Sequence, residues 1–439
     1  NRPAEKKYIE KQTPKFNHYF NEIILNKTIT KYTIVLCVEL ASNQINVTRF
    51  CWNIYHWFEF WNLFIAVNLE IGKMIETARI GSFEAATEVF MMMPCVGYVM
   101  LAILKSYNLS IYRPIYENLI KELRNMWPEG PVTKEEYAIV SNALKRLTFI
   151  SRGYYWCNHF LITLFLTPPI IGVIKRALGY DAPMVLPFFF WLPFDPFRPV
   201  LYEFLLTLQN WEALLTIWFI LSNDLLFCVF ISHLTTLLDL LSVKIRQFIY
   251  VPADQQLLNE YPLSIYSKAY MQNEQNSNFD NIDWELRHEA VIRDIISKHQ
   301  DLIRLSGDVE FLFSFILLIN FINSSIILCF CGFCSVIVEK WNEMIYKSFL
   351  LTALSQMWLL CWYGQKLLDS STGICDALYN SGWYKSIKFI LVIIFNTYDQ
   401  KIMHITTYGF SVISLASYST IVRTSWSYFT LLLKMYTRK

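Results

Sequence analysis

Seven long apolar segments follow one another along the chain, separated by polar connections. They cover residues 51–68, 83–104, 150–173, 204–234, 311–338, 346–364 and 405–433. A helix that crosses about 30 Å of hydrocarbon needs about 20 mostly apolar residues, and each segment is close to that length or longer. The pattern therefore predicts an all-α membrane protein with seven transmembrane helices.

Two shorter apolar runs, 33–40 and 387–395, are too short to cross a membrane. We interpret the first as a lead-in on the membrane surface and the second as the inner stub of a broken seventh helix. Apolar residues at helical spacing within 284–305 predict that the fifth span continues below the membrane. Five prolines in 183–199 favour an ordered, turn-rich extracellular cap.

The composition agrees with a chain that lies largely in lipid. It is 54% hydrophobic and 17% charged, whereas soluble domains carry about 25% charged residues. The predicted regions are a cytosolic N-terminal segment with the lead-in (1–50), spans one to four with an outer ligand pocket (51–246), a large cytosolic connection (247–303), spans five and six with a cytosolic anchor and the inner stub (304–396), and the final span (397–439).

The distribution of lysine and arginine predicts the orientation of the chain. About 26 of these residues lie in the N-terminal segment and the even-numbered connections, and about 10 lie on the other side. Lys105 is assigned to the second connection, on the cytosolic side. The basic side is assigned to the cytoplasm, so the N-terminus is predicted to be cytosolic and the C-terminus extracellular. This topology is opposite to that of a G-protein-coupled receptor.

Several residues could carry chemistry but are expected to have structural roles. Cys329, Cys331 and Cys334 have the spacing of a thiolate metal site, but they lie in an apolar run without a fourth ligand. His159 has no carboxylate close to it in the sequence and is expected to be a wall residue. Asp224, in the centre of the fourth span, is expected to form a buried interhelical hydrogen bond.

Motifs of the common enzyme classes are absent from the sequence. It contains no glycine-rich phosphate loop, no GxSxG elbow and no HExxH helix. We therefore expect neither an enzyme nor a cofactor. The formal net charge of +2 provides no basic field for nucleic acid. The two halves of the chain show no obvious internal repeat, which disfavours a secondary transporter.

The outer halves of four spans carry apolar side chains together with a few hydroxyl and amide groups. Because the chain direction alternates, these groups lie at similar depth in the membrane and suit a small, hydrophobic ligand. Packing against lipid explains most of these residues equally well. The candidate ligand-binding residues are Phe83, Thr87, Phe90, Met91, His159, Ile162, Thr163, Leu166, Gln209, Ala213, Thr216, Phe349, Ala353 and Met357.

Two segments near the C-terminus carry a recognisable motif. Residues 361–371 read CWYGQKLLDSS, and residues 423–432 read RTSWSYFTLL. In order, spacing and position they resemble the insect odorant receptor family. Gustatory receptors fit less well, because they carry Gln-Phe where this chain has Ser414 and Leu415. The final span also differs from that of the co-receptor, and the LPFDP sequence at 192–196 resembles moth pheromone receptors.

The resemblance implies a ligand-gated cation channel that works as a tetramer with the co-receptor, in the plasma membrane of olfactory neuron dendrites. A small hydrophobic volatile is expected to bind among spans two, three, four and six, and the final span is expected to line the pore. By the motif match, Tyr428 and Leu431 fall at the outer hydrophobic constriction, with Thr424 and Ser427 below them on the same face. Ordinary interhelical packing is the alternative role for these four residues.

Two other functions are open on the sequence alone. A metabotropic receptor would hold its N-terminus outside, where the sequons at Asn26 and Asn46 would be glycosylated. In the predicted topology these sites, and the one at Asn108, face the cytosol and stay bare. A channel or transporter without ligand gating would instead show constitutive flux.

Overall fold

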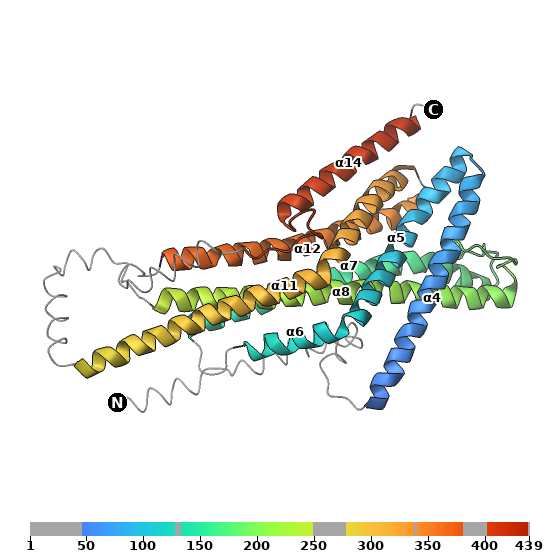
Figure 1. Cartoon of the computed structure of the whole chain (residues 1–439). Helices are drawn as coiled ribbons and strands as arrows, with labels where there is room; N and C mark the ends of the chain where they lie inside the picture. Colours follow the sequence, from blue (N-terminus) through green and yellow to red (C-terminus); the bar gives the residue numbers. More distant parts are fainter. Residues whose placement is uncertain (1–45, 128–132, 249–277, 338–339, 381–401, 438–439) are drawn as a thin grey trace.

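A computed structural model describes residues 46–127, 133–248, 278–337, 340–380 and 402–437. Within these residues the helices are α4 (Asn46–Arg79), α5 (Phe83–Ile111), α6 (Arg113–Asn125), α7 (Lys134–Ala177), α8 (Pro199–Phe248), α11 (Asn278–Ile337), α12 (Lys340–Tyr379) and α14 (Leu415–Thr437) (Figure 1). Five of them, α5, α7, α8, α11 and α12, are long and apolar enough to cross a membrane. The predicted lead-in (33–40) and inner stub (387–395) lie outside the described residues.

The helices α4 and α14 are also long enough to cross a membrane. They contain 34 and 23 residues, or about 50 and 35 Å at 1.5 Å per residue. Neither helix contains an 18-residue stretch that is as apolar and as poor in charged residues as those of the other five. In α4, the side chains of His56, Glu59 and Glu70 are all buried within the bundle. Polar groups that face protein rather than lipid are compatible with a spanning helix.

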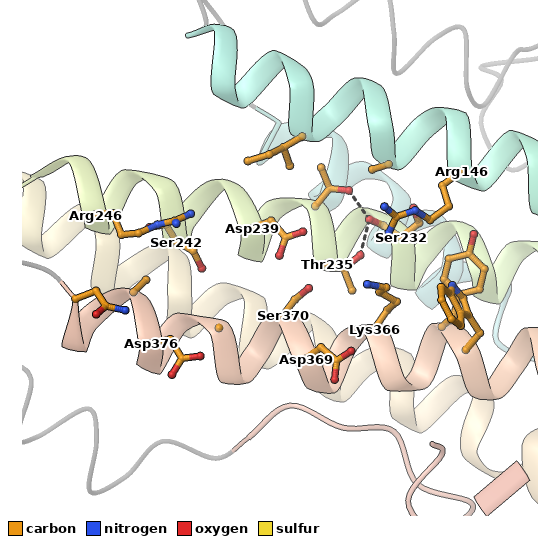
Figure 2. A pocket seen from close by; sticks show the side chains of 18 residues that line it. Arg146, Ser232, Thr235, Asp239, Ser242, Arg246, Lys366, Asp369, Ser370 and Asp376 are labelled. Atoms are coloured by element: carbon orange, nitrogen blue, oxygen red, sulfur yellow. Dashed lines mark hydrogen bonds between the residues drawn. The ribbon is translucent and has the colours of Figure 1, made fainter. Parts of the chain in front are cut away.

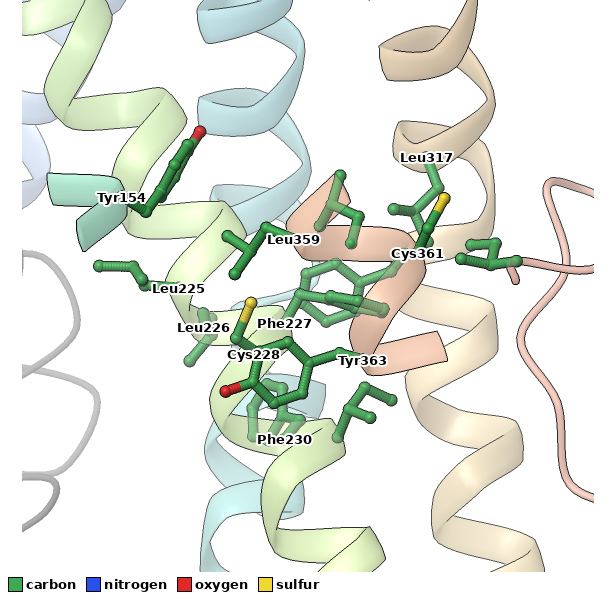
Figure 3. Close-up of a cluster of buried hydrophobic side chains, with 14 of the residues drawn as sticks. Tyr154, Leu225, Leu226, Phe227, Cys228, Phe230, Leu317, Leu359, Cys361 and Tyr363 are labelled. Carbon is green, nitrogen blue, oxygen red and sulfur yellow. The ribbon is translucent and has the colours of Figure 1, made fainter. Parts of the chain in front are cut away.

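Helix α8 forms the centre of the bundle. It contacts α4, α5, α7, α11 and α12, and it is buried on nearly all sides between residues 212 and 243. A helix that is apolar all round is suited to such a position. In Figure 3, Phe227 and Phe230 of α8 pack beside Leu359 and Tyr363 of α12. These contacts fix the two helices that also carry the polar groups described below.

The prediction that residues 284–305 continue the fifth span as one helix is confirmed. Helix α11 runs without interruption for 60 residues. Its lower part is joined to α6 by the Nη2 atom of Arg304, which lies 2.6 Å from Oε2 of Glu122. The hydrogen bond from Arg304 lowers the pKa of Glu122. This contact ties a long helical extension to the rest of the bundle.

The second connection differs from the sequence interpretation in two ways. Helix α5 continues to Ile111, so Lys105 lies inside the bundle and is fully buried, rather than in a polar connection. Burial of the ammonium group is compatible with the fold because it forms an ion pair with Asp224. The amphipathic helix α6 then follows, and it buries Tyr116 and Leu119.

The prediction of a seventh span over residues 405–433 is wrong for its first ten residues. Residues 402–414 form a tight hairpin, in which the amide of Ile413 donates to the carbonyl of Ile405 at 2.8 Å. At its tip, Tyr408 and Gly409 have φ angles of 50° and 80°, as in a type I′ turn. Helix α14 begins only at Leu415. Hydropathy alone does not distinguish a compact apolar hairpin from the start of a helix.

Candidate functional site

Four aromatic side chains from three helices and one connection meet near one end of the bundle. Phe349 of α12 lies 5.5 Å from Tyr98 of α5 and 5.9 Å from Phe165 of α7, measured between ring centroids. Phe165 in turn lies 5.3 Å from Phe188, which belongs to the connection between α7 and α8. Tilted and edge-on rings of this kind pack into a continuous apolar wall. We call these four residues the aromatic wall.

The connection between α7 and α8 covers this end of the bundle, here called the capped end (Figure 1). Gln209 of α8 is fully buried and holds both backbone groups of Phe188. Its Oε1 accepts from the Phe188 amide at 3.1 Å, and its Nε2 donates to the Phe188 carbonyl at 3.2 Å. The Tyr202 hydroxyl donates to the carbonyl of Val185 at 2.9 Å. These hydrogen bonds and the bends and turns within 187–198 confirm an ordered, turn-rich cap, whereas its extracellular location stays a prediction.

A buried polar network lies deeper in the bundle. Helix α8 rises about 22 Å between Gln209 and Asp224, and the carboxylate of Asp224 accepts hydrogen bonds from three other helices. Lys105 Nζ lies 2.5 Å from Oδ1, while the Tyr154 hydroxyl and Gln356 Nε2 donate to Oδ2 at 2.9 and 2.7 Å. The expectation that Asp224 forms a buried interhelical hydrogen bond is confirmed. The network joins α5, α7, α8 and α12 at one level.

Two polar atoms near the network and the aromatic wall have no partner within the described part of the chain. They are the hydroxyl oxygen of Tyr98 and the Oδ1 atom of Asn158. Tyr98 lies about two turns before Lys105 on α5, and Asn158 lies about one turn after Tyr154 on α7. Their residues are only 3% and 0% exposed. Because buried polar groups without partners are costly, a ligand with one hydroxyl or carbonyl group is well suited to satisfy them.

Most of the predicted ligand-binding residues lie on covered surfaces. Those that are buried are Ile162, Gln209, Ala213, Thr216, Phe349, Ala353 and Met357, and those that are half-buried are Thr87, Phe90, Met91, His159 and Leu166. Thr163 is exposed, and its hydroxyl donates to the His159 carbonyl of its own helix at 2.7 Å. Phe83 begins α5, and its side chain lies outside the described part of the structure.

Three of these residues have clear structural partners. Phe90 stacks on Phe330 of α11 with 4.9 Å between ring centroids, so it faces a helix that was not predicted to line the pocket. His159 stacks on Tyr155 of its own helix at 3.8 Å. Gln209 holds the cap. The structure thus gives these three side chains packing or anchoring contacts, while Phe349 contributes directly to the aromatic wall.

The sequence interpretation missed Tyr98, Tyr154 and Gln356 and assigned Lys105 to the wrong environment. One signal for Lys105 was available. It directly follows the apolar run 96–104, with no turn residue between them. A basic residue at such a position needs an acidic partner from another span. The other three residues could not be identified without knowing which faces of the helices meet.

The three cysteines near the end of α11 take part in helix packing. Cys329, Cys331 and Cys334 are all buried in the part of α11 that packs against neighbouring helices. Among the described residues, no group of three or more His, Cys, Asp or Glu side chains is arranged to hold a metal ion. The thiols contribute to packing as small apolar groups.

The predicted pore residues share one face of α14. Thr424, Ser427, Tyr428 and Leu431 are all exposed in the single chain, and Tyr428 and Leu431 expose 61% and 55% of their surface. The opposite face packs on α11 and α12. There Phe429 approaches Gly332 so closely that a Cβ atom on Gly332 would lie 3.1 Å from its ring. Within the described residues, the predicted pore face is therefore open to another surface or to water.

A cavity of about 480 Å³ lies away from the capped end, between α7, α8 and α12 (Figure 2). Many of its lining side chains are charged or carry a hydroxyl group. They belong to the first part of α7, up to residue 146, and to the last parts of α8 and α12. None of the predicted ligand-binding residues is among its lining residues. It is therefore a separate feature from the site at the aromatic wall.

Comparisons with known proteins identify one family. The family model "7tm Odorant receptor" matches residues 85–426. Odorant receptor 67c of Drosophila melanogaster is 27% identical over 387 residues, which is 85% of this chain and 87% of the relative. Odorant receptor 85b of the same species is 26% identical over 354 residues, covering 78% of this chain and 81% of the relative.

Two solved structures have the same fold. The olfactory receptor OR5 from Machilis hrabei aligns with a TM-score of 0.74 at 16% identity, covering 94% of this chain and all of the other. The structure of that receptor in complex with eugenol aligns with a TM-score of 0.73 at 15% identity. The predicted fold class, an all-α membrane protein with seven transmembrane helices, is confirmed. The orientation of the termini stays a prediction.

Proposed function

Because this chain belongs to the insect odorant receptor family, we propose that it is the ligand-tuned subunit of a cation channel that opens when a small hydrophobic volatile binds. The observation that carries this proposal is the buried region where α5, α7, α8 and α12 meet. It combines the aromatic wall with two buried polar atoms that have no partner among the described residues. Small-molecule sites typically combine an apolar lining with a few polar groups that fix the orientation of the ligand.

The chemistry of this region favours a long apolar ligand with a single oxygen function, such as an unsaturated alcohol, aldehyde or acetate. Its hydrocarbon part packs against Phe165 and Phe349, and its oxygen reaches Tyr98 or Asn158. The sequence at 192–196, which resembles moth pheromone receptors, supports a ligand of this kind. The related Machilis receptor has been solved in complex with eugenol, which supports a small organic ligand in this fold.

A direct chain of contacts supports coupling between the site and α14. Helix α12 carries Phe349 at the site and Gly364 about four turns further on. A Cβ atom on Gly364 would lie 2.6 Å from the carbonyl oxygen of Ile413, so the hairpin before α14 is in close contact with α12. In our proposal a shift of α12 on ligand binding is passed to α14 through this contact. Packed elements of this kind transmit small displacements between discrete arrangements.

The gate in this proposal is a ring of apolar side chains at Tyr428 and Leu431, with Thr424 and Ser427 below it. Outward movement of α14 widens the ring and lets water and cations enter, because narrow apolar constrictions close by excluding water. The ligand shifts the equilibrium only by the difference between its affinities for the open and closed states. Four subunits, including the co-receptor, surround the pore in the plasma membrane.

The N-terminus is cytosolic in this proposal, and the sequons make that orientation testable. Asn26 and Asn46 stay unmodified if the N-terminus is inside. Asn108 is uninformative, because its side chain is buried and accepts a hydrogen bond from the Tyr116 hydroxyl at 2.8 Å. A mass shift on glycosidase treatment that maps to Asn26 would favour a metabotropic topology instead.

Recordings of cation current test the proposal. Cells that express this chain with the co-receptor, and cells that express each alone, are exposed to a panel of volatiles. We expect evoked currents in the co-expressing cells. Ala353→Phe, at a buried position of α12, should abolish them, whereas Ala138→Phe, at an exposed position of α7, should not. Both variants are compared at equal surface expression, because overpacking costs about 1–3 kcal/mol. No evoked current across a broad panel would refute the proposal.

A further inference from the structure

The cavity away from the capped end has an unusual composition. Three basic residues, Arg146, Arg246 and Lys366, line it together with three acidic residues, Asp239, Asp369 and Asp376. The formal charges of these six side chains cancel. Hydroxyl groups complete the lining on α8, at Ser232, Thr235, Thr236 and Ser242. A free anion would meet three carboxylates here, and a free metal cation would meet three basic groups.

The six charged side chains do not neutralise one another in close ion pairs. Within the described chain, no ion pair with an N–O distance of 4.0 Å or less involves any of the six side chains. The indole Nε1 of Trp362, another lining residue, is buried and has no hydrogen-bond partner in the part of the chain that the structure describes. Lys366 lies over the Trp362 ring, with its Nζ 5.7 Å from the ring centroid. Two of the charged groups have a neutral partner: Asp369 accepts a hydrogen bond from Gln365 Nε2 at 2.8 Å, and Arg246 Nε donates to the Ser242 carbonyl of its own helix at 3.4 Å. The basic and acidic groups that line the cavity therefore keep hydrogen-bonding capacity for a ligand.

The two signs of charge are arranged in an order along the cavity. In Figure 2, Arg146 and Lys366 lie toward one end with Ser232, and Asp239, Ser370 and Asp369 follow in the middle. The third basic residue, Arg246, lies at the far end near Asp376. Asp369 is one helical turn beyond Lys366, a rise of about 4.5 Å. A basic end is thus followed, within a short distance, by an acidic part.

The basic end lies where the apolar spans finish. Ser232 and Thr235 lie at the end of the apolar segment 204–234, and Trp362 lies near the end of the segment 346–364. Tryptophan and lysine are common at the boundary between hydrocarbon and water. A lipid at this boundary would keep its acyl chains beside the apolar segments and extend its headgroup along the cavity. The phosphate of this headgroup would lie at the basic end of the cavity, and its terminal group, two carbon atoms further on, would lie at the acidic part.

We propose that this cavity binds a zwitterionic aminophosphate headgroup, and that its source is phosphatidylethanolamine of the adjacent leaflet. Arg146, Lys366 and the Trp362 indole donate hydrogen bonds to the phosphate. Asp239 and Asp369 accept hydrogen bonds from the primary ammonium group. A choline headgroup carries the same charges but has no N–H to donate, so it binds more weakly. Charge-assisted hydrogen bonds are the strongest of these contacts.

Native mass spectrometry of the purified full chain tests the proposal. The protein is exchanged into micelles that contain phosphatidylethanolamine, phosphatidylcholine or phosphatidylglycerol at equal concentration. We expect one tightly held phosphatidylethanolamine, with about tenfold weaker retention of the other two lipids, the size of one lost hydrogen bond to a charged group. Equal retention of the three lipids, or a preference for phosphatidylglycerol, would overturn the proposal.

Matched variants separate binding from folding. Arg146→Gln should weaken retention about tenfold, and Arg146→Lys should restore most of it because the positive charge is kept. Lys145→Gln is the control, since Lys145 is the adjacent exposed residue and does not line the cavity. Asp239→Asn should remove the preference for ethanolamine over choline. If Lys145→Gln weakens retention as much as Arg146→Gln, or if Asp239→Asn leaves the preference unchanged, the assignment is wrong.

A soluble competitor distinguishes the two sources of this headgroup. Glycerophosphoethanolamine has the same charged groups without acyl chains. If it fails to displace the bound lipid at millimolar concentration, the lipid is the ligand, as proposed. If it binds alone and displaces the lipid readily, the cavity is a site for a free zwitterion, and the lipid source is refuted. The proposal does not depend on the identity of the volatile.

Discussion

The carboxylate of Asp224 is held by Lys105, Tyr154 and Gln356, each from a different helix. Removal of one member of a buried ion pair leaves the other charge uncompensated and costs about 3–5 kcal/mol, whereas replacing both members by apolar residues is often neutral. We therefore expect Lys105→Met and Asp224→Leu each to lower the thermal unfolding midpoint strongly. The double variant should recover most of the loss. Unfolding of the detergent-purified chain measures this.

An exposed ion pair provides the control for this experiment. Lys73 Nζ lies 2.6 Å from Glu76 Oε2, and the two side chains are 38% and 51% exposed. Exposed pairs contribute about 0–1 kcal/mol, so Glu76→Gln should leave the unfolding midpoint nearly unchanged. If the double variant at Lys105 and Asp224 were no more stable than the single variants, the ion pair would not be the reason for their effect.

Substitution of Tyr98 by phenylalanine distinguishes a ligand-binding role of its hydroxyl from a structural role. It is buried without a partner in the described structure, so Tyr98→Phe removes no hydrogen bond of the folded chain and should not lower stability. If the hydroxyl binds the oxygen of the ligand, the same change should raise the half-maximal concentration for oxygenated volatiles by up to about tenfold. Responses to hydrocarbons of the same length should stay unchanged. Equal losses for both ligand classes would exclude this role.

Hydrophobic periodicity predicted most of the helices because lipid demands long apolar segments. It also predicted that α11 extends beyond its span, because the apolar spacing within 284–305 continues. The hairpin at 402–414 was missed because it is also apolar, and because its geometry depends on contacts from elsewhere in the chain. Thr406, for example, donates from both its amide and its hydroxyl to Glu310 of α11.

The candidate site could be predicted in outline but not in detail. Alternation of chain direction predicted that Phe349 lies at the same depth as residues of other spans, and its ring contacts with Tyr98 of α5 and Phe165 of α7 agree with this. It did not indicate how each helix is rotated. Phe90 turns toward α11, and Tyr98, two turns further along the same helix, meets Phe349 instead. Helix rotation is set by packing with neighbours, which a single sequence does not reveal.

The contact between α12 and the hairpin depends on a glycine. A Cβ atom on Gly364 would lie 2.6 Å from the Ile413 carbonyl oxygen and 2.7 Å from its side chain. Because the nearest atom is backbone, the hairpin must move to accept it. We expect Gly364→Ala to lower the unfolding midpoint and to reduce ligand-evoked current at equal surface expression. Thermal unfolding and current recording of the same variant measure the two effects.

A second helical glycine serves as the control. A Cβ atom on Gly307 of α11 meets nothing within 4 Å. Alanine is preferred over glycine inside a helix by roughly 0.5–1 kcal/mol, so Gly307→Ala should leave stability unchanged or raise it slightly. A Gly364→Ala variant that behaves like Gly307→Ala would show that the hairpin yields easily and does not transmit movement from α12.

In the molecule as a whole, α14 lies at one side of the bundle and packs against α11 and α12 (Figure 1). Helices α4, α5, α7, α11 and α12 contact α8, whose residues between 212 and 243 are almost completely buried. An exposed face that carries Tyr428 and Leu431 is therefore left for contacts that a single chain does not make. In a channel of four subunits this face would border the central path, and the site at the aromatic wall would remain within each subunit.

This arrangement makes the basal current sensitive to Leu431. If the exposed face of α14 forms an apolar gate, Leu431→Ala widens the gate, weakens the exclusion of water and raises the basal cation current several-fold without added ligand. Leu432→Ala is the matched control, because Leu432 is half-buried against the core and not on the exposed face. It should lower surface expression without increasing the current per channel. An unchanged leak and unchanged ion selectivity in Leu431→Ala channels would remove this residue from the gate, and an equal leak in both variants would attribute the effect to general loosening of α14.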